Sequence, residues 1–265
     1  MQPIIDIHCH IYPEKIAQKA TANVGRFYSI EMDEDGRTGT LVDDGNNAGI
    51  SHFVVCSVAT SPAQVTSINN FIASSVAESN GAMTGFGTVH PLSENMDEDV
   101  AHLVSLGLKG IKIHPDFQQF RLDSEEAQSI YENAKKYNLP VLIHTGDYRY
   151  DYSNPERFIP VLEKFPEVTF IGAHFGGWSI WEDATKKLYK YQNLLVDCSS
   201  SLYAMTAEKA KELVELYGSH RVLFGTDYPM WNPKEELERF YEIDLTDEQR
   251  ANILYNNAAK LLGIK

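Results

Sequence analysis

Eight short runs of β-branched, aromatic and other apolar residues recur along the 265 residues, each followed by a longer segment, most of them with helical periodicity. Such alternation is typical of βα units with a parallel sheet, and eight units favour a closed barrel over an open doubly wound sheet. The expected strands are Ile4–His10, His52–Val58, Met83–His90, Leu108–His114, Val141–His144, Val168–His174, Leu194–Cys198 and Val222–Asp227. Because about 250 residues are usual for a (β/α)₈ barrel, we predict one such domain over residues 1–265.

The connection after the first expected strand, Ile11–Ser51, is unusually long and contains the acidic stretch Glu31–Gly36. Loops of this length in a compact domain are usually lids, binding loops or disordered segments. This one leaves the C-terminal end of a strand and therefore lies on the barrel face that carries active sites. A lid and a solvated excursion without function are equally compatible with the sequence, and the barrel could be distorted here.

Charge and composition disfavour several classes of function. Lys and Arg number 23 against 37 Asp and Glu, a formal net charge of -14 that repels nucleic acid and anionic lipid. The three cysteines, Cys9, Cys56 and Cys198, lie in apolar runs without paired spacing, which indicates reduced core thiols. No leader or membrane-spanning run is recognisable. We expect a soluble, cytoplasmic protein acting on a small molecule, without nucleic acid or membrane partners; the sequence is compatible with a homodimer.

Six of the nine histidines lie at or beside the C-terminal ends of expected strands, which converge on one mouth in a barrel: His8, His10, His90, His114, His144 and His174. His8 and His10 are two apart on one strand, so both project to the same face, with Asp6 one layer below. A lone His-x-His is often only a pair of surface or hydrogen-bonded histidines. Here further candidate ligands follow at strand ends, including Asp227, and such a set favours Zn²⁺ or a similar first-row cation.

Motifs distributed along the chain carry a family resemblance. They are IDIHCH at residues 5–10, IHT at 143–145, GAHFGG at 172–177, LFGTDYP at 223–229 and ILYNNAA at 253–259. Together they resemble the amidohydrolase superfamily, and most closely its amidohydrolase-related branch, which is similar to aminocarboxymuconate semialdehyde decarboxylase and related metal-dependent TIM-barrel hydrolases. The combination is specific for the fold and the metal site but not for the substrate.

The resemblance implies one divalent cation with three histidine ligands and one aspartate ligand, namely His8, His10, His144 and Asp227. It also implies that His174 lies close to the metal-bound water. In binuclear relatives the corresponding imidazole binds metal as well, helped by a modified lysine on the fourth strand. Lys112 is the candidate for that lysine, although an ion pair between Lys112 and Asp6 is the simpler interpretation.

Four further residues follow expected strands and could contact a planar or carboxylated substrate: His114, Arg149, Trp178 and Tyr228. They could equally cover the top of the barrel.

The chemistry that we predict is hydrolysis of an ester, lactone or amide. The cation would lower the pKa of bound water and polarise the carbonyl, Asp227 would transfer the proton, and His174 would orient the water or stabilise the oxyanion. The alternative is non-oxidative decarboxylation of an aromatic or unsaturated acid, by analogy with relatives. Decarboxylases of this branch tend to be longer, and a compact chain with an open mouth favours hydrolysis. Mere metal storage is disfavoured, because an open coordination position beside an imidazole and a carboxylate is a catalytic arrangement.

Overall fold

The computed structural model describes residues 3–264 and contains one eight-stranded sheet in the order β1 to β8. The strands are β1 (Ile5–His10), β2 (His52–Cys56), β3 (Met83–Thr88), β4 (Gly110–Ile113), β5 (Val141–Ile143), β6 (Phe170–Gly172), β7 (Leu194–Asp197) and β8 (Val222–Leu223). The chain around β8 returns to β1 through a parallel bridge between Cys9 and Tyr228 and a 3.0 Å hydrogen bond from the Ile7 N–H to the Phe224 carbonyl. The predicted (β/α)₈ barrel is confirmed.

The strands are shorter than predicted, and except at β1, which ends at His10 as predicted, the residues expected at their C-terminal ends lie beyond them. His144 follows β5 directly, whereas His174 and Asp227 come after β6 and β8 have ended. Both residues have left-handed backbone, with φ of +60° at His174 and +59° at Asp227, a conformation that does not continue a strand.

Helices occupy most of the connections. They are α1 (Ala17–Tyr28), α2 (Thr38–Ala48), α3 (Val65–Glu78), α4 (Met96–Ser105), α5 (Pro115–Gln118), α6 (Glu125–Tyr137), α7 (Pro155–Lys164), α8 (Trp181–Leu188), α9 (Ala207–Tyr217), α10 (Pro233–Tyr241), α11 (Asp247–Ala251) and α12 (Asn257–Leu262). Local signals account for two of the helix starts: Thr246 and Gln249 form a capping box before α11, and the Asn232 side chain accepts hydrogen bonds from two backbone N–H groups of α10. Within residues 3–264, no helix has the length and apolar character to cross a bilayer.

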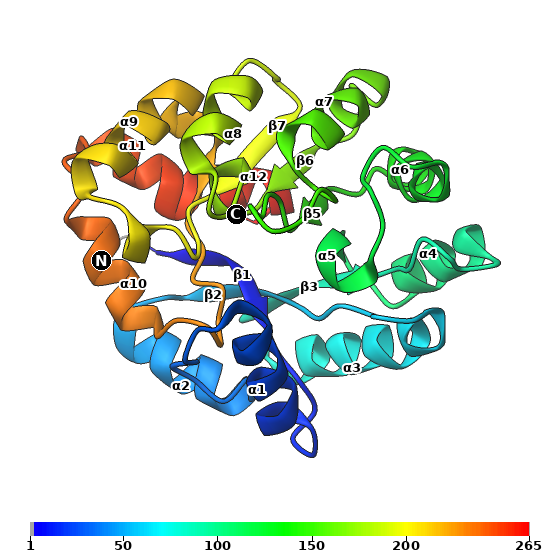
Figure 1. Cartoon of the computed structure of the whole chain (residues 1–265). Helices are drawn as coiled ribbons and strands as arrows, with labels where there is room; N and C mark the ends of the chain where they lie inside the picture. The colour runs from blue at the N-terminus through cyan, green and yellow to red at the C-terminus, as the bar shows by residue number, and fades with distance from the viewer. Residues whose placement is uncertain (1–2, 265) are drawn as a thin grey trace. The chain divides into compact units, whose positions relative to one another are not determined.

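The chain divides into two compact units. The first comprises the chain up to Cys56, residues 75–84 and the chain from Cys198 onward, and the second comprises residues 57–74 and 85–197. In the first unit, α2 and α10 lie side by side (Figure 1). In the second unit, α4 packs against α6 and α7 against α8. The strands supply buried apolar side chains to each unit, including Phe53 in the first and Phe170 in the second.

The long connection after β1 is ordered, because α1 and α2 lie within it. The segment between these helices bonds to the residues that follow β8. The Glu34 N–H donates to the Pro229 carbonyl at 3.1 Å, and the Tyr228 hydroxyl donates to the Arg37 carbonyl at 2.8 Å. The connection after β1 is therefore not a freely solvated loop. The connection packs instead on the segment that carries Asp227.

Candidate metal centre

Three ligand atoms meet in the first unit. His8 Nε2 and His10 Nε2 are 3.1 Å apart, and Asp227 Oδ1 lies 3.4 Å from the first and 3.5 Å from the second. Bonds of 2.0 to 2.1 Å to a tetrahedral Zn²⁺ place neighbouring ligand atoms about 3.3 Å apart. These side chains are at most 13% exposed. Both the spacing and the donor types therefore fit a divalent cation.

Asp6 joins β1 to the segment that carries Asp227. Its carboxylate accepts hydrogen bonds from the His8 N–H at 3.1 Å, the Thr226 N–H at 3.0 Å and the Thr226 hydroxyl at 2.6 Å. Burial raises the pKa of Asp6 to about 6, and the bonds from Thr226 and His8 oppose that rise. Asp6 therefore fixes two of the ligand-bearing segments relative to each other.

Two consecutive serines after β7 contact the candidate ligands. Ser199 Oγ lies 3.1 Å from His8 Nδ1. Ser200 Oγ donates to Asp227 Oδ2 at 2.6 Å and accepts from the Trp231 indole N–H at 2.9 Å. The sequence predicts metal ligands but not these supports, because serines carry no motif of their own. Their position directly after a strand is the only signal that points to them.

The backbone is unusual at the residues that carry chemistry. Among the positions with positive φ that are not glycine are His174, Ser200 and Asp227. Such conformations are unfavourable for side chains other than glycine and concentrate at functional sites, where the surrounding structure maintains them.

In the second unit, His144 pairs with His174. His144 Nδ1 lies 3.1 Å from His174 Nε2, and the His174 N–H donates to Asp197 Oδ1 at 3.0 Å. Burial, together with the positive charge of the fully buried Lys112, lowers the pKa of His144 to about 3. His144 is therefore a neutral imidazole, the form that binds a metal.

His114 and Asp116 flank His144. The His114 and His144 rings stack with centroids 3.9 Å apart and planes 4° from parallel. Asp116 Oδ2 lies 3.3 Å from His144 Nε2. Burial, together with the charge of Asp147, raises the pKa of Asp116 to about 7. Asp116 and Asp197 were missed in the sequence because each follows or ends a strand without a recognisable motif.

The predicted substrate residues have structural partners. Arg149 holds Asp147 with two nitrogens, at 2.7 Å from Nη2 and 3.0 Å from Nε, and its guanidinium lies 5.5 Å from the centre of the Trp178 ring. Tyr228 is fully buried, with its hydroxyl bonded into the connection after β1. This placement favours a structural role for Tyr228, whereas Arg149 retains an exposed fraction of 24%.

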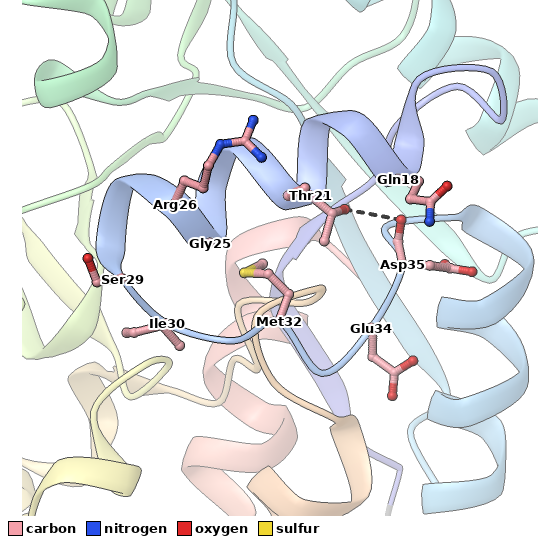
Figure 2. A pocket seen from close by; sticks show the side chains of 10 residues that line it. Gln18, Thr21, Gly25, Arg26, Ser29, Ile30, Met32, Glu34 and Asp35 are labelled. Atoms are coloured by element: carbon pink, nitrogen blue, oxygen red, sulfur yellow. Dashed lines mark hydrogen bonds between the residues drawn. The ribbon is translucent and has the colours of Figure 1, made fainter.

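A cavity of about 740 Å³ lies between α1 and the segment at residues 29–35 (Figure 2). The Thr21 hydroxyl donates to the Asp35 carbonyl at 3.1 Å across it. Its lining combines one cation, Arg26, with the carboxylates of Glu34 and Asp35 but includes none of the histidines. It is thus distinct from the imidazole clusters.

A model of the family described as Amidohydrolase matches residues 5–264. Solved structures of similar fold include an uncharacterised TIM-barrel protein from Bordetella bronchiseptica, which is 20% identical over 99% of both chains with a TM-score of 0.81. A dihydroxybenzoic acid decarboxylase from Polaromonas, with bound manganese and the inhibitor 2-nitroresorcinol, is 16% identical over 100% of this chain and 98% of that one, with a TM-score of 0.74.

A probable 2-pyrone-4,6-dicarboxylic acid hydrolase from Acinetobacter baumannii, with citric acid bound, is also similar. It is 16% identical over 98% of this chain and 99% of that one, with a TM-score of 0.71. The coverage is almost complete for the decarboxylase and for the hydrolase alike, so overall extent does not distinguish the two kinds of relative. At identities this low, the TM-scores establish a common fold and do not extend to function.

Proposed function

Because the chain belongs to the amidohydrolase family, we propose that it is a metal-dependent hydrolase of an ester, lactone or amide bond in a small, carboxylated or aromatic substrate. The observation that carries the proposal is the convergence of His8 Nε2, His10 Nε2 and Asp227 Oδ1 at 3.1 to 3.5 Å. His144, the fourth proposed ligand, belongs to the second unit, and its inclusion rests on the sequence motif and on its neutral imidazole.

Zn²⁺ is the proposed cation because imidazoles outnumber carboxylates in the donor set. The manganese in the Polaromonas decarboxylase supports Mn²⁺ as the alternative. The bound cation would supply an acidified water molecule and a polarised carbonyl group.

The chain's own residues would then handle the proton and the developing charge. Asp227 accepts the proton from the attacking water and delivers it to the leaving group, while Ser200 holds its Oδ2 atom in place. His174 orients the water or stabilises the oxyanion. Arg149, fixed by Asp147, is the proposed contact for a substrate carboxylate, and Trp178 and His114 are proposed to line the same pocket.

Elemental analysis of protein purified without added metal tests the cation. We expect about one divalent ion per chain, most of it zinc, on the basis of the donor set. Two stoichiometric ions, with a carbamate on Lys112, would replace the mononuclear proposal by a binuclear one.

Turnover assays test the reaction class. The metal-loaded protein is screened against lactones, esters and amides beside hydroxybenzoates and related aromatic acids, with His8→Ala as the control. We expect turnover of at least one lactone, ester or amide that chelation abolishes and zinc restores. Release of CO₂ from an aromatic acid, with no hydrolysis in the panel, would make the enzyme a decarboxylase instead.

A further inference from the structure

The indole of Trp231 is the far end of a chain of hydrogen bonds that leads to the candidate metal centre. Trp231 lies just before α10 and is 9% exposed. Its Nε1–H donates to Ser200 Oγ at 2.9 Å, and the Ser200 hydroxyl donates to Asp227 Oδ2 at 2.6 Å. The other oxygen of this carboxylate, Oδ1, lies 3.4 Å from His8 Nε2 and 3.5 Å from His10 Nε2. All of these residues belong to the first unit.

The chemistry of the three groups fixes the direction of this chain. An indole N–H can only donate a hydrogen bond, and an ionised carboxylate can only accept one. The Ser200 hydroxyl therefore accepts from Trp231 and gives its single proton to another group. Met230 Sδ, 3.3 Å from Ser200 Oγ, is a second acceptor within reach, but a thioether sulfur accepts weakly. Because a hydroxyl that accepts a hydrogen bond donates a stronger one, the indole strengthens the bond to Asp227.

Contacts on its ring hold Trp231 in place. The Tyr203 ring stacks on it with centroids 4.4 Å apart and planes 28° from parallel. The Arg239 guanidinium lies 5.2 Å from the centre of the indole ring. Arg239 is itself fixed by two carboxylates of α10, those of Glu235 and Glu236. A side chain that is locked by packing in this way can hold a neighbouring hydroxyl at a defined position.

A purely structural role for the indole is the competing interpretation, because buried tryptophans usually find some partner for the N–H. Trp181 shows that such a partner is not guaranteed in this fold, since its Nε1 is buried and has none among residues 3–264. The backbone also argues for function. Both Ser200 and Asp227 have left-handed backbone, with φ of +44° and +59°. This conformation is unfavourable for them and concentrates at functional sites.

We propose that Trp231 is a positioning residue that acts on Asp227 through the Ser200 hydroxyl. The indole keeps Ser200 Oγ where it bonds Asp227 Oδ2, and the carboxylate thereby keeps Oδ1 turned toward His8 and His10. The inference rests on the cation of the proposed function but not on the reaction class. Because the effect passes through one hydroxyl, removal of that hydroxyl should abolish the influence of the indole.

The first test measures the zinc dissociation constant by competition with a chromophoric chelator. Trp231→Phe removes the N–H and keeps an aromatic ring beside Tyr203. We expect it to weaken zinc binding about 10-fold, the lower end of what loss of an outer support costs elsewhere. Trp181→Phe is the matched control, because it makes the same substitution where the N–H has no partner within the described part of the chain. Zinc binding by Trp231→Phe with the wild-type constant would overturn the proposal.

A double variant separates positioning from loss of packing. Ser200→Ala removes the hydroxyl through which the indole acts, so the addition of Trp231→Phe should weaken zinc binding no further. Loss of packing would instead add the full effect of Trp231→Phe in either background. Additive losses of affinity in the double variant would therefore contradict the proposal.

The indole N–H resonance of Trp231 tests the same connection without an activity assay. In ¹H–¹⁵N spectra of metal-free protein, Ser200→Ala should shift this proton upfield, because its acceptor is lost. Asp227→Ala should shift it in the same direction by less, because the hydroxyl is no longer polarised by the carboxylate. An unchanged Trp231 resonance in Asp227→Ala would count against the connection. Failure of the wild type to bind any metal would instead count against the proposed function, and the metal-free spectra would still decide whether Trp231 acts on Asp227.

Discussion

His144, a proposed metal ligand, illustrates how burial keeps a single imidazole neutral. Its pKa is lowered to about 3 by burial and by the charge of Lys112, so that no proton competes for the ring at neutral pH. At His8 and His10 the geometry also disfavours protonation. Their Nε2 atoms are only 3.1 Å apart and cannot both carry protons without repulsion. Preorganisation of this kind reduces the cost of assembling the ligands when the ion arrives.

Ser200→Ala removes the hydrogen bond that holds Asp227 Oδ2. We expect about 10-fold weaker metal binding and a lower kcat with little change in KM, because a support of a metal ligand is lost without a substrate contact. Chelator competition and steady-state kinetics measure the two effects. Ser201→Ala is the matched control, since that hydroxyl donates to the Ser199 carbonyl instead. Equal losses of metal binding and kcat in both variants would show that the effect comes from general packing and not from the bond to Asp227.

His8→Ala and His174→Asn are expected to differ. His8→Ala should lose metal and activity together, whereas His174→Asn should keep most of the metal and lose turnover, in line with the role proposed for His174 beside the water. Metal content after dialysis, measured beside kcat, separates the two. The 3.1 Å separation from His144 Nδ1 makes the opposite outcome informative, because strong metal loss in His174→Asn would identify it as a ligand.

Helix α10 contains a buried acid that makes the stability of the fold depend on pH. Burial raises the pKa of Glu236 from 4.5 to about 7 despite its pairing with Arg239, and Glu236 Oε2 has no hydrogen-bond partner within residues 3–264. Since the folded-state pKa is raised, the stabilising contribution of the protonated form is complete below pH 4.5 and is lost as pH rises through about 7.

Glu236→Gln should therefore match the wild type near pH 5 and exceed its unfolding free energy near pH 8. The gain would be at most about 3.4 kcal/mol, because the pKa rises from 4.5 to about 7 and each pH unit corresponds to about 1.36 kcal/mol. Urea unfolding at the two pH values measures it. Glu235→Gln, which changes a mostly exposed neighbour that also pairs with Arg239, should show no comparable gain. A gain at pH 5 as large as at pH 8 would rule out this titration.

At the level of elements, the sequence predicts the eight strands and their order, because apolar runs and turn residues are local signals. It does not predict the strand ends, because the departure of His174 and Asp227 from the sheet depends on left-handed backbone that only the surrounding structure imposes. The connection after β1 is the largest miss. Its two helices are partly polar, and their packing against residues after β8 is a long-range property.

The candidate site was predictable only where its residues carry a motif. His8, His10 and Asp227 stand in motifs, and the structure brings their ligand atoms together. Ser199 contacts His8 and Ser200 contacts Asp227, residues that are distant in the chain, and no spacing in the sequence predicts these contacts.

For the whole molecule, the proposed cation is a source of stability as well as of chemistry. A ligand that binds only the folded chain at 100 times its dissociation constant adds about 2.7 kcal/mol to the unfolding free energy. For a protein of this size each kcal/mol corresponds to roughly 2 to 4 °C. We therefore expect zinc to raise the unfolding temperature by about 5 to 10 °C in a calorimetric scan. His8→Ala should show no such rise, and an equal rise in that variant would locate the zinc elsewhere.

The hydrogen bond from the Trp231 indole to Ser200 gives the molecule an optical reporter of the candidate metal centre. Only three tryptophans occur in the chain, and the indole N–H of Trp231 is connected through Ser200 Oγ to Asp227. Indole emission responds to hydrogen bonding and to nearby charge. A cation bound by Asp227 should therefore change the fluorescence of Trp231 without any added dye. Titration of metal into Trp178→Phe/Trp181→Phe protein would then report occupancy in real time, and stopped-flow mixing would yield the rate at which the centre fills.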